Sequence, residues 1–256
     1  MARFALMPPL DRVPLILDFV DMDSQKWREL AVGARPGLAW VYRREAVTLA
    51  AFEARAAGQA MASLVVNERE AEIARRLAPE ADIEVVPNGV ELGRLGRVTP
   101  AEQTARVVFC GVMNYAPNDQ AMNWFVRHVW PAVRAQRPDA TLAIVGASPR
   151  PALTTLCAGD PSIEVTGRVP DVRDWLWCSA VGIAPLQVAR GVQNKALEAI
   201  AAGLPIVITE AVAAGLPHAV AHACSVANTP SEFARHVLAL LALTPEQRRG
   251  RVVAPV

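Results

Sequence analysis

Short apolar runs alternate with longer amphipathic stretches along the whole chain. The runs are typical of buried parallel strands, which need not alternate with polar residues. The stretches between them place apolar residues at helical spacing. This alternation predicts repeated strand–helix units and therefore an α/β fold built on parallel sheets. The runs lie at 14–20, 61–66, 83–86, 107–110, 142–145, 163–165 and 181–185.

A polar stretch at 91–104 divides these units into two series. It follows a strong turn signal, Pro87-Asn88-Gly89. We therefore predict two Rossmann-like domains, with residues 1–97 in the first and residues 98–256 in the second. A chain of 256 residues is long enough for two modest domains or a single large one.

Composition narrows the functional classes. The chain is 52% hydrophobic with a net charge of +1, which argues against nucleic-acid binding. Its four cysteines lie far apart, as reduced thiols in a cytoplasmic protein would. His218 and His222 have no acidic partner nearby, so we interpret them as structural and expect no metal. The pair Arg43 and Arg44 is interpreted as a solvated helix face, with peripheral contact to the inner face of the plasma membrane as the alternative.

The richest chemistry lies at 185–209, where a polar loop enters a helix that stops before an apolar strand. Gly191 provides backbone freedom in a loop that ends at Asn194. Lys195 and Glu198 share one helical face near the helix start, where unpaired N–H groups favour phosphate. Lys195 is placed to add charge to a diphosphate and Glu198 to meet sugar hydroxyls. The alternative is an exposed Lys/Glu pair of no special function.

Two further strand ends carry candidate residues. The first run delivers three acids, of which Asp21 is placed to bind an acceptor hydroxyl or take its proton. The alternative for the residues that follow it is simple helix capping. After 107–110, a tight loop from Gly111 to Asn114 allows a ligand to approach the backbone closely.

The run G-x-x-x-K-x-x-E-A-x-A-x-G-x-P-x-V-x-T, which starts at Gly191, resembles the donor-site signature of retaining glycosyltransferases of family 4, which have the GT-B fold. The order of its segments resembles the sugar transferases associated with bacterial exosortase/PEP-CTERM exopolysaccharide systems. The supporting segments are LDFVDMDSQKW (17–27), VPNGVE (86–91), VVFCGVMNYAPN (107–118) and VTGRVPDV (165–172).

The resemblance implies transfer of a hexose from a nucleotide-diphospho-sugar to a glycan or polyprenyl-linked acceptor, with retention and without a cofactor. It implies that Glu198 holds the ribose diol and that Asp21 lines the cleft. Gly111, Asn114, Gly191 and Asn194 would also serve the donor. The loop of Gly167, Arg168 and Val169 would lie beside the base, on which the Arg168 guanidinium could stack.

This chain departs from the family pattern in three places. Val112 stands where many relatives carry an arginine for the diphosphate, and Arg190 stands where they carry the first glutamate of a pair. We therefore expect Arg190 to act on the diphosphate, with Lys195, or on an acidic sugar. The alternative is an exposed loop charge.

The first domain also lacks its expected opening strands, so the predicted GT-B-like fold has an incomplete N-terminal domain with exposed sheet edges. This leaves two alternatives open. One is a non-catalytic nucleotide-sugar-binding or interaction subunit, and the other is a nucleotide-sugar epimerase.

Overall fold

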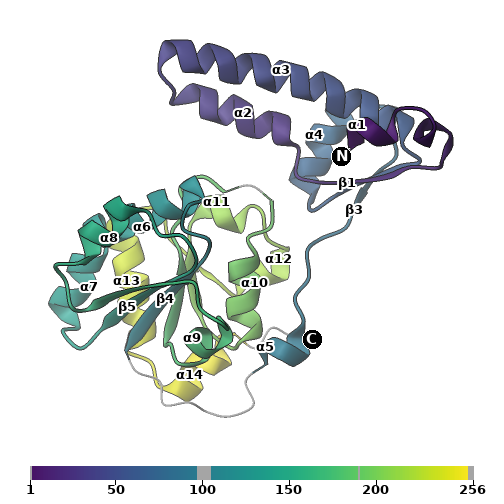
Figure 1. The fold of residues 1–256 in the computed structure, drawn as a ribbon. Coiled ribbons are helices and arrows are strands. Elements are labelled where there is room, and N and C mark those ends of the chain that lie inside the picture. The colour runs from purple at the N-terminus through teal and green to yellow at the C-terminus, as the bar shows by residue number, and fades with distance from the viewer. Residues whose placement is uncertain (1, 97–104, 190, 253–256) are drawn as a thin grey trace. The chain divides into compact units, whose positions relative to one another are not determined.

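A computed structural model describes residues 2–96, 105–189 and 191–252. The chain divides into two compact units, and the division falls after Asn88. The second unit comprises residues 89–189 and 193–256. Both units alternate helices with parallel strands, as the apolar runs predict (Figure 1). No helix in the described ranges has the length and apolarity that crossing a membrane requires.

The first unit is built on a three-stranded parallel sheet in the order β1-β2-β3. Two antiparallel helices, α2 and α3, form a long hairpin between the first two strands (Figure 1). The elements are α1 (Ala2–Ala5), a 3-10 turn (Leu10–Arg12), β1 (Ile16–Val20), α2 (Asp23–Val32), α3 (Pro36–Gln59), β2 (Ala62–Val65), α4 (Glu68–Leu77) and β3 (Ile83–Val85).

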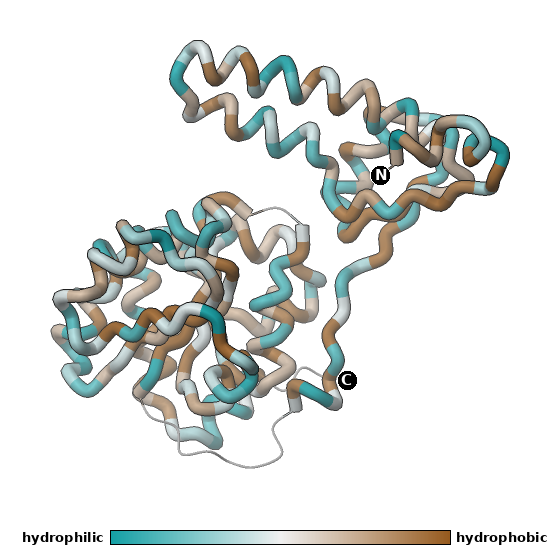
Figure 2. Tube along the Cα trace, viewed as in Figure 1, coloured by the Kyte–Doolittle hydropathy of each residue, from teal (hydrophilic) through white to brown (hydrophobic). Residues whose placement is uncertain are grey.

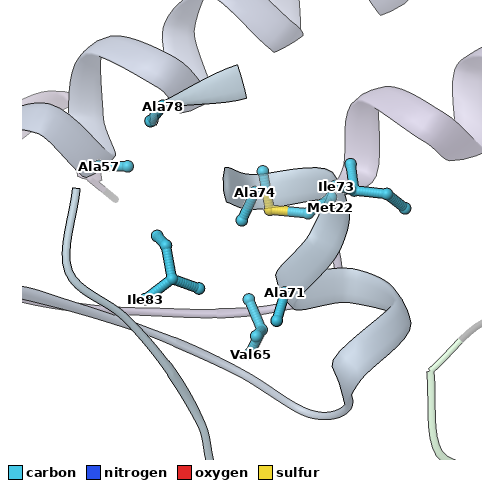
Figure 3. Close-up of a cluster of buried hydrophobic side chains, with 8 residues drawn as sticks. All are labelled: Met22, Ala57, Val65, Ala71, Ile73, Ala74, Ala78 and Ile83. Carbon is cyan, nitrogen blue, oxygen red and sulfur yellow. The ribbon is translucent and has the colours of Figure 1, made fainter. Parts of the chain in front are cut away.

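One face of this sheet carries the core of the unit. Alternation along the strands turns Leu17, Val65 and Ile83 inward, where they are buried. Figure 3 shows Val65 and Ile83 with Met22 and the small side chains of α3 and α4 around them. Ile16, next to Leu17 on β1, is 63% exposed. Because β1 and β3 are the outer strands of the sheet, the unit has the exposed edges and apolar surface expected from the sequence.

Two buried carboxylates hold the start of α2. Glu53 on α3 accepts a hydrogen bond from the Ser24 amide at 3.0 Å, and Glu70 on α4 accepts one from the Met22 amide at 2.8 Å. A helix start offers unpaired N–H groups and a positive dipole end, which acids stabilise. The turn that carries Asp21 is therefore anchored to both neighbouring helices.

The second unit is a six-stranded parallel sheet in the order β6-β5-β4-β7-β8-β9. This is the doubly wound order, in which the chain reverses direction across the sheet between β4 and β7 and leaves a crevice at their carboxyl ends. Apart from Arg106 and Thr141, which open β4 and β5, the inner strands are apolar (Figure 2). The strands are β4 (Arg106–Cys110), β5 (Thr141–Val145), β6 (Ile163–Gly167), β7 (Val181–Ala184), β8 (Ile206–Ile208) and β9 (Ser225–Val226).

Helices cover both faces of this sheet (Figure 1). The helix α13 packs on α7, where Phe125, Trp130 and Phe233 form an aromatic core with ring centroids 5.7 and 6.2 Å apart. The helix α10 packs against β7 and β8. The helices are α6 (Ala116–His128), α7 (Trp130–Gln136), α8 (Pro151–Cys157), α9 (Arg173–Trp177), α10 (Asn194–Ala201), α11 (Glu210–Ala213), α12 (His218–His222), α13 (Pro230–Leu241) and α14 (Pro245–Gly250).

A short helix, α5 (Leu92–Leu95), lies within the stretch that the sequence identified as a connection. The Trp177 indole donates a hydrogen bond to the Leu95 carbonyl at 2.9 Å, and the Arg173 guanidinium donates one to the Arg94 carbonyl at 3.2 Å. These bonds tie α5 to the second unit. This agrees with the division of the compact units, which places residues 89–95 in the second unit.

Candidate functional site

Three glycines lie side by side at the carboxyl ends of β4, β5 and β6. The Gly111 amide donates to the Val145 carbonyl at 2.9 Å, and the Gly146 amide donates to the Gly167 carbonyl at 3.1 Å. A Cβ on Gly146 would lie 1.8 Å from the Gly111 carbonyl oxygen, and its φ is +152°. Gly167 has a φ of +69°. The backbones therefore approach one another closely, and the loops present main chain to the crevice.

Lys195 in the first turn of α10 reaches toward the end of β4. Its ammonium Nζ donates to Asn118 Oδ1 at 3.2 Å and to Gln193 Oε1 at 3.1 Å. It also lies 5.5 Å from the centroid of the Phe109 ring. These contacts distinguish Lys195 from the exposed half of a surface Lys/Glu pair.

The surroundings of Lys195 and Glu198 on α10 shift the pKa of each group. Burial lowers the pKa of Lys195 to about 8, against the opposing influence of Glu198 and Cys110. Burial also raises the pKa of Glu198, and the Lys195 charge opposes this change. Shifted groups beside a crevice are typical of functional sites. Below pH 8, Lys195 offers a cation for a ligand anion.

A cavity of about 290 Å³ opens beside Glu198. Three segments of the second unit form its walls: the chain leading into and through α5, the turn into α9, and the first two turns of α10. Charged groups dominate it, and the Arg173 and Asp171 side chains pair at its edge. The lining residues are Gly89, Val90, Glu91, Arg94, Leu95, Asp171, Val172, Arg173, Asn194 and Glu198.

A further cation stands at the β4 loop. Arg150, from the loop after β5, donates to the Asn114 carbonyl at 3.3 Å and lies 3.9 Å from Asp119. It brings positive charge to the loop in which Val112 replaces an expected arginine. Sequence reasoning missed Arg150, because nothing in the local pattern connects it with a loop 36 residues earlier.

Other residues predicted from the sequence take varied places. Gly191 is buried with a φ of +59°, a conformation that glycine adopts readily. Arg168 and Val169 precede the cavity residues 171–173, with Pro170 between them. Asp21 follows Val20, whose φ of +63° is rare for a β-branched residue. Arg190 lies outside the described residues.

The predicted structural histidines both lie on α12, with ring centroids 4.0 Å apart. Among the residues that the structure describes, no group of three or more His, Cys, Asp or Glu side chains is placed to hold a metal ion.

Solved structures share this fold. WaaG, a glycosyltransferase involved in lipopolysaccharide biosynthesis, matches with a TM-score of 0.71 and 15% identity, over 96% of this chain and 70% of that one. Anabaena Alr3699/HepE, in complex with UDP and glucose, matches with a TM-score of 0.66 and 14% identity, over 95% of this chain and 66% of that one. Sucrose-phosphate synthase from Thermosynechococcus elongatus matches with a TM-score of 0.66 and 18% identity, over 93% of this chain and 62% of that one.

The chain thus spans about two thirds of the length of these proteins. The likeness confirms the predicted GT-B-like α/β fold with parallel sheets. No curated protein matches the sequence. A family model described as glycosyl transferases group 1 matches residues 104–243, more than half of the chain and most of the second unit. The chain therefore belongs to the group 1 glycosyl transferases.

Proposed function

We propose that this protein transfers a hexose from a nucleotide-diphospho-sugar to a glycan or polyprenyl-linked acceptor, with retention, in exopolysaccharide biosynthesis. One observation carries the proposal. Helix α10 carries both a cation, Lys195, and a carboxylate that lines the cavity, Glu198. Both lie near the carboxyl ends of β4 and β7, where the strand order reverses direction. Ligands of doubly wound sheets bind at this point.

In this proposal the nucleoside occupies the cavity beside Glu198, whose carboxylate accepts hydrogen bonds from the ribose hydroxyls. Asn194 lines the same cavity. The backbone of the loop from Gly167 through Arg168 to Val169 lies beside the base, because residues 171–173 of the same turn form one cavity wall.

The diphosphate then points toward Lys195 and the loop from Gly111 to Asn114. Lys195, the start of α10 and Arg190 stabilise the negative charge that develops on the diphosphate as the bond to the sugar breaks. As the bond between the sugar and the diphosphate breaks, the acceptor oxygen bonds to the sugar, and Asp21 binds the acceptor hydroxyl and takes its proton. The reaction as proposed uses no cofactor.

Membrane contact belongs to the same proposal and concerns the first unit. Trp40 on α3 is 65% exposed, and Arg43 and Arg44 on the same helix are exposed as well. A tryptophan flanked by cations suits the surface of an anionic membrane. This supports a cytoplasmic protein that reaches a polyprenyl-linked acceptor at the inner face of the membrane. Sedimentation with anionic vesicles tests it, and Trp40→Ala should reduce the bound fraction.

A second candidate is a nucleotide-sugar-binding subunit without transferase activity. It is favoured by the three-stranded first sheet and by the coverage of only about two thirds of related structures. Such a subunit would keep the donor cavity and bind nucleotides without turnover.

Calorimetric titration with UDP, GDP, ADP and dTDP tests donor binding. Mass spectrometry of the matching nucleotide-glucose, with and without a polyprenyl-phosphate-linked acceptor, then tests transfer. Glycosylated acceptor supports the transferase, and binding without product supports the subunit. Formation of an epimerised nucleotide sugar would indicate the epimerase alternative. The variant Glu198→Gln should weaken binding about tenfold through lost ribose contacts, whereas unchanged affinity would remove Glu198 from the site.

A further inference from the structure

Asn118 joins three segments at the carboxyl end of β4. It lies in the first turn of α6 and is only 4% exposed. Its side-chain Nδ2 donates to the Val112 carbonyl at 3.0 Å, and its Oδ1 accepts from Lys195 Nζ at 3.2 Å. A Cβ on Gly111 would lie 2.8 Å from Asn118 Nδ2, so the amide packs directly against that glycine.

The chemistry of an amide explains why asparagine suits this position. Its NH₂ group can only donate and its oxygen can only accept. Since the NH₂ group faces a carbonyl, the oxygen is left to face the ammonium of Lys195. An aspartate could not donate to the Val112 carbonyl, and a leucine could satisfy neither partner. The Asn118 side chain therefore links the Gly111–Val112 turn to the Lys195 ammonium.

We propose that Asn118 is a positioning residue, which holds the Lys195 ammonium against the Gly111–Val112 turn so that its charge faces an incoming diphosphate. The identity of that ligand rests on the proposed function, but the coupling between the two side chains does not. Asn118 acts through Lys195 and touches no reacting atom.

The titratable groups around Lys195 define what a change at position 118 would do. Glu198 faces it from the same helix and Cys110 from the end of β4, and both favour the protonated amine, while burial lowers its pKa to about 8. Asn118→Asp adds an acidic group beside Nζ and should raise the pKa of Lys195. Asn118→Leu removes the accepting oxygen but keeps the burial, and should lower the pKa further.

The chain contains only two lysines, Lys26 and Lys195, so the predicted shifts in the pKa of Lys195 can be measured directly. Protein labelled with ¹³C at the lysine ε-carbon gives two signals to follow by NMR titration between about pH 6 and 11. Lys26 is exposed in the first unit and serves as the internal reference. Asn123→Asp is the matched control, because Asn123 lies on α6 and bonds to the Asp119 carbonyl.

Opposite shifts of the Lys195 pKa in the Asp and Leu variants, with no shift in the control, are the expected result. If Asn118 had only a structural role, the pKa of Lys195 would shift in the same direction in both variants or would not shift in either. An unmoved Lys195 signal in Asn118→Asp, which nearly keeps the side-chain shape, overturns the proposal even if Asn118→Leu does not fold.

A binding measurement completes the test. Asn118→Leu should weaken UDP about tenfold while leaving uridine unchanged, because only the diphosphate meets Lys195. If the titration described above selects GDP, then GDP and guanosine replace this pair. Equal losses for nucleotide and nucleoside would contradict the positioning role. If the parent protein binds no nucleotide, the proposed function fails, and the NMR titration still decides the coupling.

Discussion

The indole nitrogen of Trp177 lies 2.9 Å from the carbonyl oxygen of Leu95 and donates a hydrogen bond to it. This bond fastens the last residue of α5 to the end of α9. The chain that leads into and through α5 and the turn into α9 form most of the cavity beside Glu198. Together with the bond from Arg173 to the Arg94 carbonyl, the Trp177 bond holds the two cavity walls together.

Trp177→Phe should lower the free energy of unfolding by about 1 kcal/mol, because the ring remains but the Leu95 carbonyl loses its donor. Urea denaturation measures this change. Calorimetry should also show weaker nucleoside binding once α5 is released. Trp40→Phe, at an exposed site, is the control and should alter neither quantity. Unchanged values for both variants would mean that the bond does not hold α5.

Gly146→Ala should destabilise the protein by about 2 kcal/mol or more, because a Cβ would meet the Gly111 carbonyl and the backbone conformation is unsuited to alanine. Thermal or urea unfolding measures the effect. Gly159→Ala is matched to it, since nothing lies within 4 Å of a Cβ there. Its change should stay within about 0.5 kcal/mol. Similar results for the two variants would contradict the close approach of the β4 and β5 loops.

Affinity for a nucleoside diphosphate should fall as pH rises through about 8, where Lys195 loses its proton. The ligand adds no step of its own there, because phosphate groups complete their ionisation near pH 6. Lys195→Arg should remove the step, since guanidinium stays charged. Calorimetry across this range makes the comparison. A step that persists in the arginine variant would assign it to another group.

Glu53→Gln should change how stability depends on pH. Burial raises the pKa of Glu53 above 4.5, so the folded state keeps a proton that the unfolded chain releases. The contribution of Glu53 is therefore complete below pH 4.5 and is lost as pH rises through the raised value.

Glutamine keeps an oxygen for the Ser24 amide and carries no charge. The variant should be at least as stable as the parent at neutral pH and should lack this slope, which urea denaturation at several pH values measures. Glu45→Gln, on a less buried position of α3, is the control. A loss of stability at neutral pH in Glu53→Gln alone would show that the ionised carboxylate is what holds α2.

Much of the fold is predictable because buried strands leave a local signal. The runs at 107–110 and 142–145 appear as β4 and β5 within a residue, and α10 begins at Asn194, the residue at which the predicted loop ends. The exposed edges of the first sheet also follow from counting strands. Asp21 and Arg190 remain predictions, because their roles depend on a ligand.

The partners of the site residues were beyond sequence reasoning. Asn118 reads locally as the opening of a helix, and its bond to Lys195 joins positions 77 residues apart. The stretch 91–104 reads as a polar connection because α5 has a single turn and too few apolar positions for a period. Tertiary contacts of this kind are set by the strand order, which only the folded chain reveals.

Lys195 and Glu198 are carried on one short helix, α10, of eight residues. Lys195 faces the loops of β4, while Glu198 faces α5 and the turn into α9, so different stretches of chain surround each. In the proposed function, the residues around the nucleoside can therefore change without altering the contacts between Lys195 and the diphosphate. A relative that uses a different nucleotide is then expected to differ first in residues 89–95 and 171–173.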